Sequence, residues 1–408
     1  MPTLTIDRLG HLGDGIAHAD SQTIFVPGAL PGEEVSGEIA GDILAKPRIV
    51  TPSPDRVAPP CRHAKACGGC QVQHASDAFV AGWKQDVVAT ALAAHGIETE
   101  FRKIATSPPR SRRRATFSSR RTKGGALAGF HQKRSDVIVS VPDCLVVHPD
   151  IAHALPLAEE LARLGGSRKG ELDVAVTRSE AGLDIVVRGG KPADGALRVE
   201  LARLAEDNDL ARLSWGEDET LERRPPHITF GPTRVTPPPG AFLQATPQGE
   251  AALRDGVFEA VGGAKRVADL FSGCGTFALP LSDRAEVHAI EASRAMLAAL
   301  DAGWRHAGGL RKVTTEARDL FRAPVIAGDL EAYDAVVMDP PRAGAEAQVA
   351  EIAEAQVPRI AHVSCNPVTF ARDSATLIRA GYRLDWVQVV DQFRWSTHVE
   401  IVAQLTLS

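Results

Sequence analysis

The chain has 408 residues, of which 44% are hydrophobic and 24% are charged. These values are typical of a globular protein with two to three domains, and they exclude a disordered or fibrous chain. The sequence contains no run of about 18 apolar residues and no secretory signal, so we expect a cytoplasmic protein without a membrane span. Six cysteines are too few for a disulfide scaffold. In a reducing compartment, clustered cysteines indicate metal binding or catalysis.

The net charge of −5 is distributed unevenly. The segment from Phe101 to Arg134 contains eleven Lys and Arg residues and no acidic residue, whereas the rest of the chain has 35 basic and 51 acidic residues. Such a basic segment predicts a local anionic partner, and guanidinium groups both pair with phosphate and stack on bases. We expect RNA to contact Arg112, Arg113, Arg114, Arg120 and Arg121. The alternative is a solvated basic loop that pairs with acidic residues elsewhere.

Residues 1–50 contain short strand-like segments separated by Gly and Pro-Gly turns, which fits a small five-stranded, OB-like barrel. A proline-rich linker follows at 51–60. Residues 77–95 have helical periodicity, with Asp77 as the expected N-cap. Residues 151–230 contain helix-like and strand-like pieces without recognisable chemistry. From about residue 241, strands and helices alternate and predict a doubly wound α/β sheet closed by a hairpin.

This organisation predicts three domains. They are a barrel at 1–54, a small α+β central domain at 55–235, and an α/β domain at 236–408. The helix at 77–95 is also a candidate to pack on the last domain.

A glycine-rich turn follows the predicted strand 266–271. Gly273 and Gly275 allow the backbone to approach a ligand at the carboxyl end of that strand. Glu291 ends the next strand, where an acidic side chain commonly bonds a ribose diol. A dinucleotide site prefers a third glycine, and this chain has Ala278 there. The pattern therefore indicates a different nucleotide-like cofactor.

Two further motifs stand at strand ends. Asp339-Pro340-Pro341-Arg342 follows one apolar strand, and Cys365-Asn366-Pro367 follows another. A cysteine beside a cofactor crevice is well placed as a nucleophile, whereas the alternative is a buried structural cysteine. Cys-Asn-Pro forms a turn instead of continuing the core, which favours the nucleophile.

The glycine-rich turn DLFSGCGTF at 269–277 and the Asp-Pro-Pro element resemble motifs of class I S-adenosylmethionine-dependent methyltransferases. Methylation of uracil at C5 would explain why such an enzyme needs a thiolate, because C5 is a poor nucleophile by itself. Addition of the thiolate to C6 makes C5 an enolate carbon that accepts a methyl group. A base must then remove the C5 proton so that the thiolate can leave. This base should be a carboxylate or a histidine on a nearby element, and the C-terminal segment Thr397-His398-Val399-Glu400 offers both.

These motifs resemble the RNA 5-methyluridine methyltransferases, a family of class I S-adenosylmethionine-dependent enzymes. The similar segments are Phe242-Leu243-Gln244, the DLFSGCGTF stretch at 269–277, DPPR, SCNP and HVE. The resemblance implies a Rossmann-like methyltransferase domain, S-adenosylmethionine as cofactor, Cys365 as nucleophile and Glu400 as proton acceptor. The implied cofactor-binding residues are Gln244, Phe271, Gly273, Gly275, Thr276, Glu291, Asp319 and Asp339. The chain departs from the family at Arg394 and Thr246, where Pro and Asn are usual.

A second cysteine group suggests a metal site. Cys61, Cys67 and Cys70 lie within ten residues, and Cys144 follows 74 residues later. Thiolates favour zinc or an iron–sulfur cluster, and the spacing alone does not distinguish these two kinds of site. His63 and His74 could complete a zinc site in place of the distant cysteine. Relatives with a Cys-Gly-Gly-Cys element bind a [4Fe-4S] cluster through four cysteines. The resemblance therefore implies that all four cysteines hold such a cluster.

The first 50 residues are also similar to a TRAM barrel. A TRAM barrel together with the cluster is most similar to the 23S rRNA uracil-5-methyltransferases, whereas tRNA-acting relatives generally lack both. We therefore predict a monomeric enzyme that methylates uracil C5 in RNA, with rRNA favoured over tRNA. Cytosine C5 methylation is an alternative, although Arg342 stands where those enzymes typically carry a second cysteine. RNA binding without catalysis and a nicotinamide-dependent oxidoreductase activity are two further hypotheses.

Overall fold

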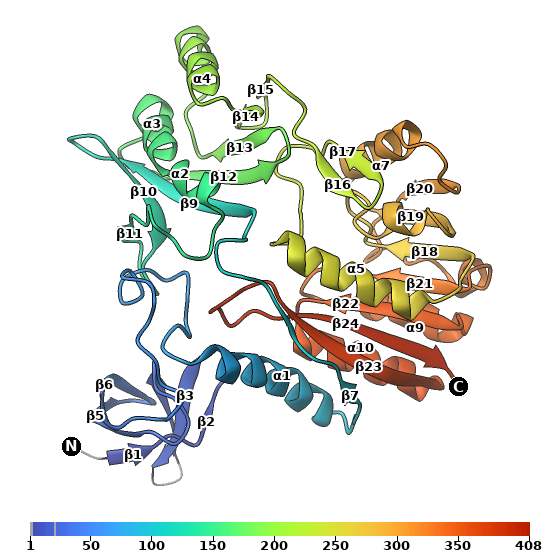
Figure 1. The fold of residues 1–408 in the computed structure, drawn as a ribbon, viewed down its shortest axis with the longest axis horizontal. Helices are drawn as coiled ribbons and strands as arrows, with labels where there is room; N and C mark the ends of the chain where they lie inside the picture. Colours follow the sequence, from blue (N-terminus) through green and yellow to red (C-terminus); the bar gives the residue numbers. More distant parts are fainter. Residues whose placement is uncertain (1–2, 20–21) are drawn as a thin grey trace.

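The computed structural model describes residues 3–19 and 22–408, and its strands form three large sheets (Figure 1). A six-stranded sheet at the N-terminal end is followed by a seven-stranded and a nine-stranded sheet, with a two-stranded ribbon between the last two. Within the described ranges, no helix is both long and apolar enough to cross a membrane.

The N-terminal sheet encloses its own small apolar core, which includes Ile6, Ile24, Val35 and Leu44. Its strand order is β1-β5-β6-β4-β3-β2, so it has one strand more than the five that the sequence predicts. The strands are β1 (Thr3–Thr5), β2 (Arg8–Leu9), β3 (Asp14–Ala19), β4 (Gln22–Pro27), β5 (Glu34–Ala40) and β6 (Ile43–Thr51).

The central sheet is mostly antiparallel and carries its helices on one side. Helix α3 packs against β9 and β10, and its buried leucines join those of α4 in one apolar cluster. The strands are β9 (Arg114–Arg121), β10 (Ala126–His131), β11 (Ile138–Val139), β12 (Leu172–Ser179), β13 (Gly182–Arg188), β14 (Arg212–Trp215) and β15 (Glu219–Glu222). The helices are α2 (Pro149–His153), α3 (Leu155–Gly165) and α4 (Gly195–Asp207).

The C-terminal sheet confirms the predicted doubly wound fold. Its order is β20-β19-β18-β21-β22-β24-β23-β7, with five parallel strands followed by the antiparallel β24. The strands are β18 (Arg266–Leu270), β19 (Glu286–Glu291), β20 (Val313–Ala317), β21 (Ala335–Met338), β22 (Arg359–Ser364), β23 (Tyr382–Asp391) and β24 (Glu400–Leu407). The ribbon that precedes them consists of β16 (Ile228–Phe230) and β17 (Thr233–Val235).

Helices cover both faces of this sheet, and the side chains between the layers form two separate apolar clusters. Residues of α5 (Pro247–Val261), α6 (Ala278–Leu281) and α7 (Arg294–His306) belong to one cluster. Residues of α8 (Ala327–Leu330), α9 (Glu346–Ala355) and α10 (Pro367–Arg379) belong to the other. Parallel strands buried on both faces are uniformly apolar, as the Ala-Val-Val-Met run of β21 illustrates.

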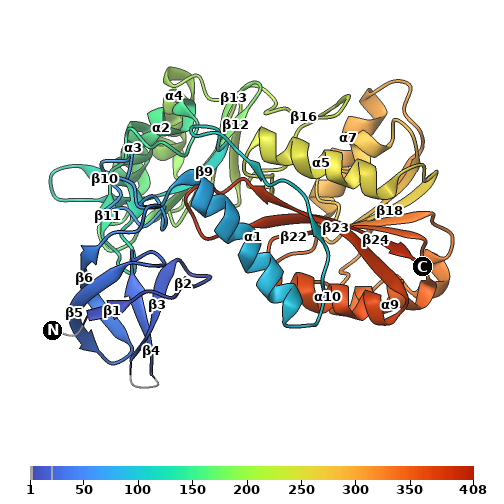
Figure 2. The ribbon, with the colours of Figure 1, turned by 60° about the horizontal axis from the view of Figure 1, so that its bottom comes forward.

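Helix α1 (Asp77–Ala93) connects the barrel to the C-terminal sheet (Figure 2). It packs against α10 and places Val88 and Leu92 in the core of that sheet. Its N-cap is Ser76, whose hydroxyl accepts a hydrogen bond from the Phe79 N–H, so the expected cap at Asp77 is wrong by one residue. After the helix, β7 (Glu100–Phe101) and β8 (Ala105–Thr106) pair with β23.

A buried ion pair fixes α1 to the loop that follows β23. Lys84 is fully buried, and its ammonium donates to Asp391 Oδ1 at 2.6 Å and to the Phe393 carbonyl at 3.1 Å. Removing one partner of a buried pair leaves an uncompensated charge in the interior.

We therefore expect Lys84→Met to lower the free energy of unfolding by about 3–5 kcal/mol. Chemical denaturation monitored by circular dichroism measures this change. Arg305→Ala is the control, because it removes an exposed i,i+4 pair with Asp301 and should cost no more than about 0.5 kcal/mol. Equal effects of the two substitutions would show that the Lys84 pair does not stabilise the fold.

Candidate active site

The glycine-rich turn lies at the carboxyl ends of the parallel strands, the edge at which an open α/β sheet has its ligand-binding crevice. Phe271 and Gly273 have positive φ angles of 62° and 55°, so the chain turns sharply after β18. No atom lies within 4 Å of the point where a Cβ of Gly273 would stand, so the backbone there faces open space. At Gly275 a Cβ would approach the Leu279 side chain to 2.8 Å, which requires glycine for packing. Thr276 follows in the same turn.

Glu291 is held in place at the end of β19. Its Oε2 accepts a hydrogen bond from the Gly273 N–H at 3.2 Å, and its Oε1 accepts from the Ser293 N–H at 2.9 Å. Asp319 lies after β20 and accepts from the Phe321 N–H at 3.0 Å. The Phe321 ring packs on Phe271 with 5.7 Å between centroids. Strand ends and the turn thus bring four predicted cofactor-binding residues to one edge of the sheet.

Two carboxyl groups at this edge, one buried and one half-buried, are suited to a cation. Asp269 is fully buried, and no described side chain donates a hydrogen bond to its carboxyl oxygens. Burial raises its pKa well above the usual value, and burial raises the pKa of the half-buried Asp339 to about 7. Ionising acids in such surroundings is costly unless a positively charged ligand compensates them. The positively charged sulfonium and ammonium groups of S-adenosylmethionine fit this requirement.

The pairing of β22 with β24 brings Cys365 and Glu400 together. Ser364 is opposite Ile401 in the antiparallel ladder, so the next residues outward, Cys365 and Glu400, are neighbours at the same sheet edge. Burial and the charges of Glu400 and Asp339 raise the pKa of the Cys365 thiol to about 11, and Arg342 opposes this shift. Burial and Asp339 raise the pKa of Glu400 to about 8.

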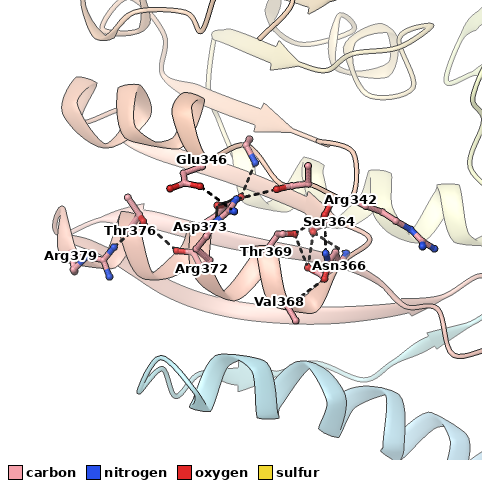
Figure 3. Close-up of polar contacts among 12 residues, drawn as sticks. Arg342, Glu346, Ser364, Asn366, Val368, Thr369, Arg372, Asp373, Thr376 and Arg379 are labelled. Carbon is pink, nitrogen blue, oxygen red and sulfur yellow. Dashed lines mark hydrogen bonds and ion pairs between the residues drawn. The ribbon is translucent and has the colours of Figure 1, made fainter. Parts of the chain in front are cut away.

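Hydrogen bonds connect the two motif loops that border Cys365 (Figure 3). Asn366 caps α10 by accepting from the Val368 N–H, and its side-chain amide donates to the Arg342 carbonyl at 2.8 Å. Deeper in the helix, Asp373 accepts from the Ala345 N–H at 3.0 Å. The DPPR and Cys-Asn-Pro segments therefore form one rigid unit around the thiol.

Gln392 carries no sequence motif that points to it, yet it occupies the centre of the site. It lies between Gln244 and Glu400 and bonds to both side chains. Gln244 in turn donates to Asp339 Oδ2 at 3.2 Å. No spacing or composition signal singles out Gln392, because its role depends on the folding of loops about 150 residues apart in sequence.

Positively charged side chains from two domains surround Glu400. Arg342 Nη2 bonds to His398 Nδ1 at 2.9 Å, which makes His398 a loop contact. Arg114, at the start of β9, is close enough to lower the pKa of Glu400. Its guanidinium stacks over Phe242, 4.5 Å from the ring centroid, and Phe242 is 53% exposed. A cationic and aromatic rim of this kind suits an RNA nucleotide.

The other predicted RNA-binding arginines have different environments. Arg113 is buried and forms an ion pair with Glu250, so it supports the fold and is not accessible to a phosphate, contrary to the expectation. Arg112 is half-buried over the Phe393 ring. Arg120 and Arg121 are exposed on β9, where Arg120 pairs with Glu171.

All four cysteines of the second group line one cavity of about 350 Å³ beneath the central sheet, although Cys144 is distant in sequence. His63 also lines it but bonds Asp143 at 2.7 Å, and His74 does not line it. In the described part of the chain, no three His, Cys, Asp or Glu side chains converge closely enough to hold a single metal ion. The Gly69 N–H donates to Cys67 Sγ at 3.4 Å.

Comparisons with known proteins agree with this geometry. The family model described as tRNA (Uracil-5-)-methyltransferase matches residues 240–407, and the TRAM domain model matches residues 3–39. An uncharacterized RNA methyltransferase of Rhizobium meliloti is 43% identical over 99% of both chains. The 23S rRNA (uracil(1939)-C(5))-methyltransferase RlmD of Nitrosococcus oceani is 33% identical and covers 98% of this chain and 94% of its own length.

A solved structure also covers nearly the whole chain. The Pyrococcus abyssi tRNA (uracil-54, C5)-methyltransferase in complex with S-adenosyl-L-homocysteine has a TM-score of 0.77 at 22% identity and covers 99% of both chains. Its fold therefore extends over the barrel as well. This neighbour is therefore an exception to the expectation that tRNA-acting relatives generally lack both the barrel and the cluster.

We expect Asp269→Asn to weaken the binding of S-adenosylhomocysteine roughly 10- to 100-fold, because it removes a buried carboxyl group, near Asp339 and Glu291, that a cationic ligand would hold in its ionised form. Isothermal titration calorimetry measures the affinity. Asp255→Asn is the control, since Asp255 is an exposed residue of α5. An unchanged affinity in the Asp269 variant would show that this carboxyl group does not contribute to cofactor binding.

Proposed function

Because the chain belongs to the tRNA (uracil-5-)-methyltransferase family, whose members act on RNA with S-adenosylmethionine, we propose that it methylates C5 of a uridine in 23S rRNA through a covalent cysteine adduct. The observation that carries the adduct is the neighbouring position of the half-buried Cys365 and the buried Glu400, directly beyond the last pair of the β22–β24 ladder. The similarity to RlmD over 98% of the chain supports rRNA as the substrate.

The residues of the site have separate tasks in this proposal. Cys365 Sγ bonds to C6 of the uracil, and the electron pair of the C5–C6 double bond passes to the enolate. S-adenosylmethionine supplies the methyl group that becomes bonded to C5. Glu400 then takes the C5 proton, the C5–C6 double bond forms again, and the C6–S bond breaks to release the thiolate. Asp269, Asp339 and Gln244 would hold the cofactor beside C5.

Arg342 is suited to favour the thiolate. It is the positive group that opposes the rise in the pKa of Cys365, and its position is fixed by Asn366 and His398. The target base must leave its stack to reach this depth, so base flipping is expected. Phosphate contacts from exposed Arg120 and Arg121 would offset part of that cost.

Two substitutions separate the steps. Cys365→Ala should abolish both product and adduct, because Cys274 is buried in the apolar core and the other four cysteines line a separate cavity. Glu400→Gln should form the adduct and accumulate it, because the C5 proton stays on the ring. Denaturing gel electrophoresis of the protein with labelled RNA measures the adduct. An adduct that persists in Cys365→Ala, or unchanged product release in Glu400→Gln, would contradict the assignment.

The release step should depend on pH. A base acts in its ionised form, and the pKa of Glu400 is raised to about 8 by burial and by Asp339, with Arg114 and Arg342 acting in the opposite direction. We therefore expect the rate of adduct breakdown to increase between about pH 6 and 8 and then to level off. Single-turnover quench experiments on the preformed adduct measure this rate. A rate that is constant over this range would exclude a raised pKa for the base.

We also propose that the four cysteines hold a [4Fe-4S] cluster. All four thiols line one cavity of about 350 Å³, and four cysteine thiolates are the usual ligands of such a cluster. The N–H bond to Cys67 Sγ suits an anionic sulfur, and hydrogen bonds to sulfur are common at such clusters. The role proposed for the cluster is structural, because the cysteine-rich segment supports the loop before Glu400. The Gln71 and Val72 N–H groups, next to Cys70, both donate to the Trp395 carbonyl in that loop.

Anaerobically purified protein should therefore be brown, with absorbance near about 400 nm. Cys67→Ser should lose this absorbance and most of the bound iron, whereas Cys365→Ala should retain both. Metal analysis by mass spectrometry gives the iron content. Stoichiometric zinc without iron in the wild-type protein would contradict the cluster.

A further inference from the structure

Gln392 forms a buried hydrogen-bonded connection between the two acids of the active site. The side chain is 2% exposed and follows directly after β23. Its amide bonds to Glu400 on one side and to Gln244 on the other, and Gln244 bonds to Asp339. The four side chains therefore form a continuous chain from the cofactor crevice to the proposed base.

The direction of every bond in this chain is determined by the backbone. Gln392 Oε1 is 2.7 Å from the Ala245 N–H and 3.4 Å from the Thr246 N–H, and backbone N–H groups only donate. Nε2 must therefore be on the opposite side. It donates to Gln244 Oε1 at 2.6 Å and to Glu400 Oε2 at 3.1 Å.

The same constraint sets the orientation of Gln244. Since its Oε1 accepts from Gln392, its Nε2 faces Asp339 and donates to Oδ2 at 3.2 Å. The backbone of Gln244 and Ala245, which orients this series of side-chain hydrogen bonds, is itself held in place. Arg113 Nε donates to the Gln244 carbonyl, the Arg113 N–H donates to the Ala245 carbonyl, and Arg113 pairs with Glu250. The buried arginine therefore supports the site from behind.

We propose that Gln392 is a positioning residue that holds Glu400 Oε2 as a hydrogen-bond acceptor and leaves Oε1 to receive the C5 proton. This inference rests on the proposed function, in which Glu400 is the base. A carboxylate accepts through both oxygens, so protonation of Oε1 leaves the bond from Gln392 to Oε2 intact. The carboxyl group thus keeps its orientation while the C5 proton is transferred, the double bond forms and the thiolate leaves.

The test is to separate methyl transfer from loss of the C5 proton. Wild-type protein and Gln392→Leu are mixed with S-adenosylmethionine carrying a labelled methyl group and with RNA tritiated at uridine C5. Adduct formation is followed as methyl label bound to protein, and proton loss as tritium released to water. We expect Gln392→Leu to form the adduct at nearly the wild-type rate and to release tritium about 10- to 100-fold more slowly.

Gln348→Leu is the matched control. Gln348, on α9, is equally buried, and among the described residues its side chain bonds to the backbone of Val325 alone. This variant should leave the ratio between the rates of adduct formation and tritium release unchanged. Melting temperature and S-adenosylhomocysteine affinity report whether each variant keeps its fold and crevice, and Gln392→Met provides a second variant of similar length. An equal loss in both steps for both Gln392 variants would overturn the positioning role. Absence of any adduct in the wild-type protein would instead overturn the proposed function.

Discussion

The antiparallel register between β22 and β24 is the constraint on which the site depends. It aligns Ser364 with Ile401 and so brings the thiol of Cys365 beside the carboxyl of Glu400. A further parallel strand would not bring these two residues together, because parallel strands all begin at one edge of the sheet and end at the opposite edge. The antiparallel β24 begins at the edge where β22 ends. The final hairpin supplies this strand. It also makes a one-residue slip costly, because such a slip would turn every buried side chain of β24 to the opposite face.

The loop between β23 and β24 is where the three parts of the protein meet. Lys84 of α1 binds Asp391 at its beginning, and the cysteine-rich segment bonds to the Trp395 carbonyl in its middle. In the barrel, a Cβ at Gly13 would lie 3.0 Å from Thr397, so the turn after β2 contacts the same loop. The orientation of Glu400 therefore depends on elements that are distant in sequence. The barrel and the cysteine-rich segment thus both contact the loop that precedes Glu400.

Much of the architecture could be predicted because local rules determine it. Alternating apolar segments and glycine turns predicted the doubly wound parallel sheet and its closing hairpin, and motifs at strand ends indicated Cys365, Asp339 and Glu291. The amide network around Gln392 could not be predicted, since its bonds join loops that only the tertiary fold brings together. Arg113 shows the same limit. In sequence it belongs to a basic cluster, yet its neighbour Glu250 comes from a helix more than 130 residues later.

Charge explains why the site needs its ligands. Asp269 and Glu400 are buried, Asp339 and Cys365 are half-buried, and burial raises the pKa of each of these acidic groups. A cationic cofactor and the arginines at the rim compensate this concentration of acids. The crevice is therefore complementary to a positively charged methyl donor on one side and to an RNA nucleotide on the other.

The most direct test of the proposed reaction is nucleoside mapping by mass spectrometry. Unmodified 23S rRNA and tRNA are incubated separately with S-adenosylmethionine and the protein, with Cys365→Ala as the control. We predict new 5-methyluridine in 23S rRNA with the wild-type protein and none with the variant. 5-Methyluridine in tRNA alone would contradict the rRNA assignment, and product formed by Cys365→Ala would contradict the covalent mechanism.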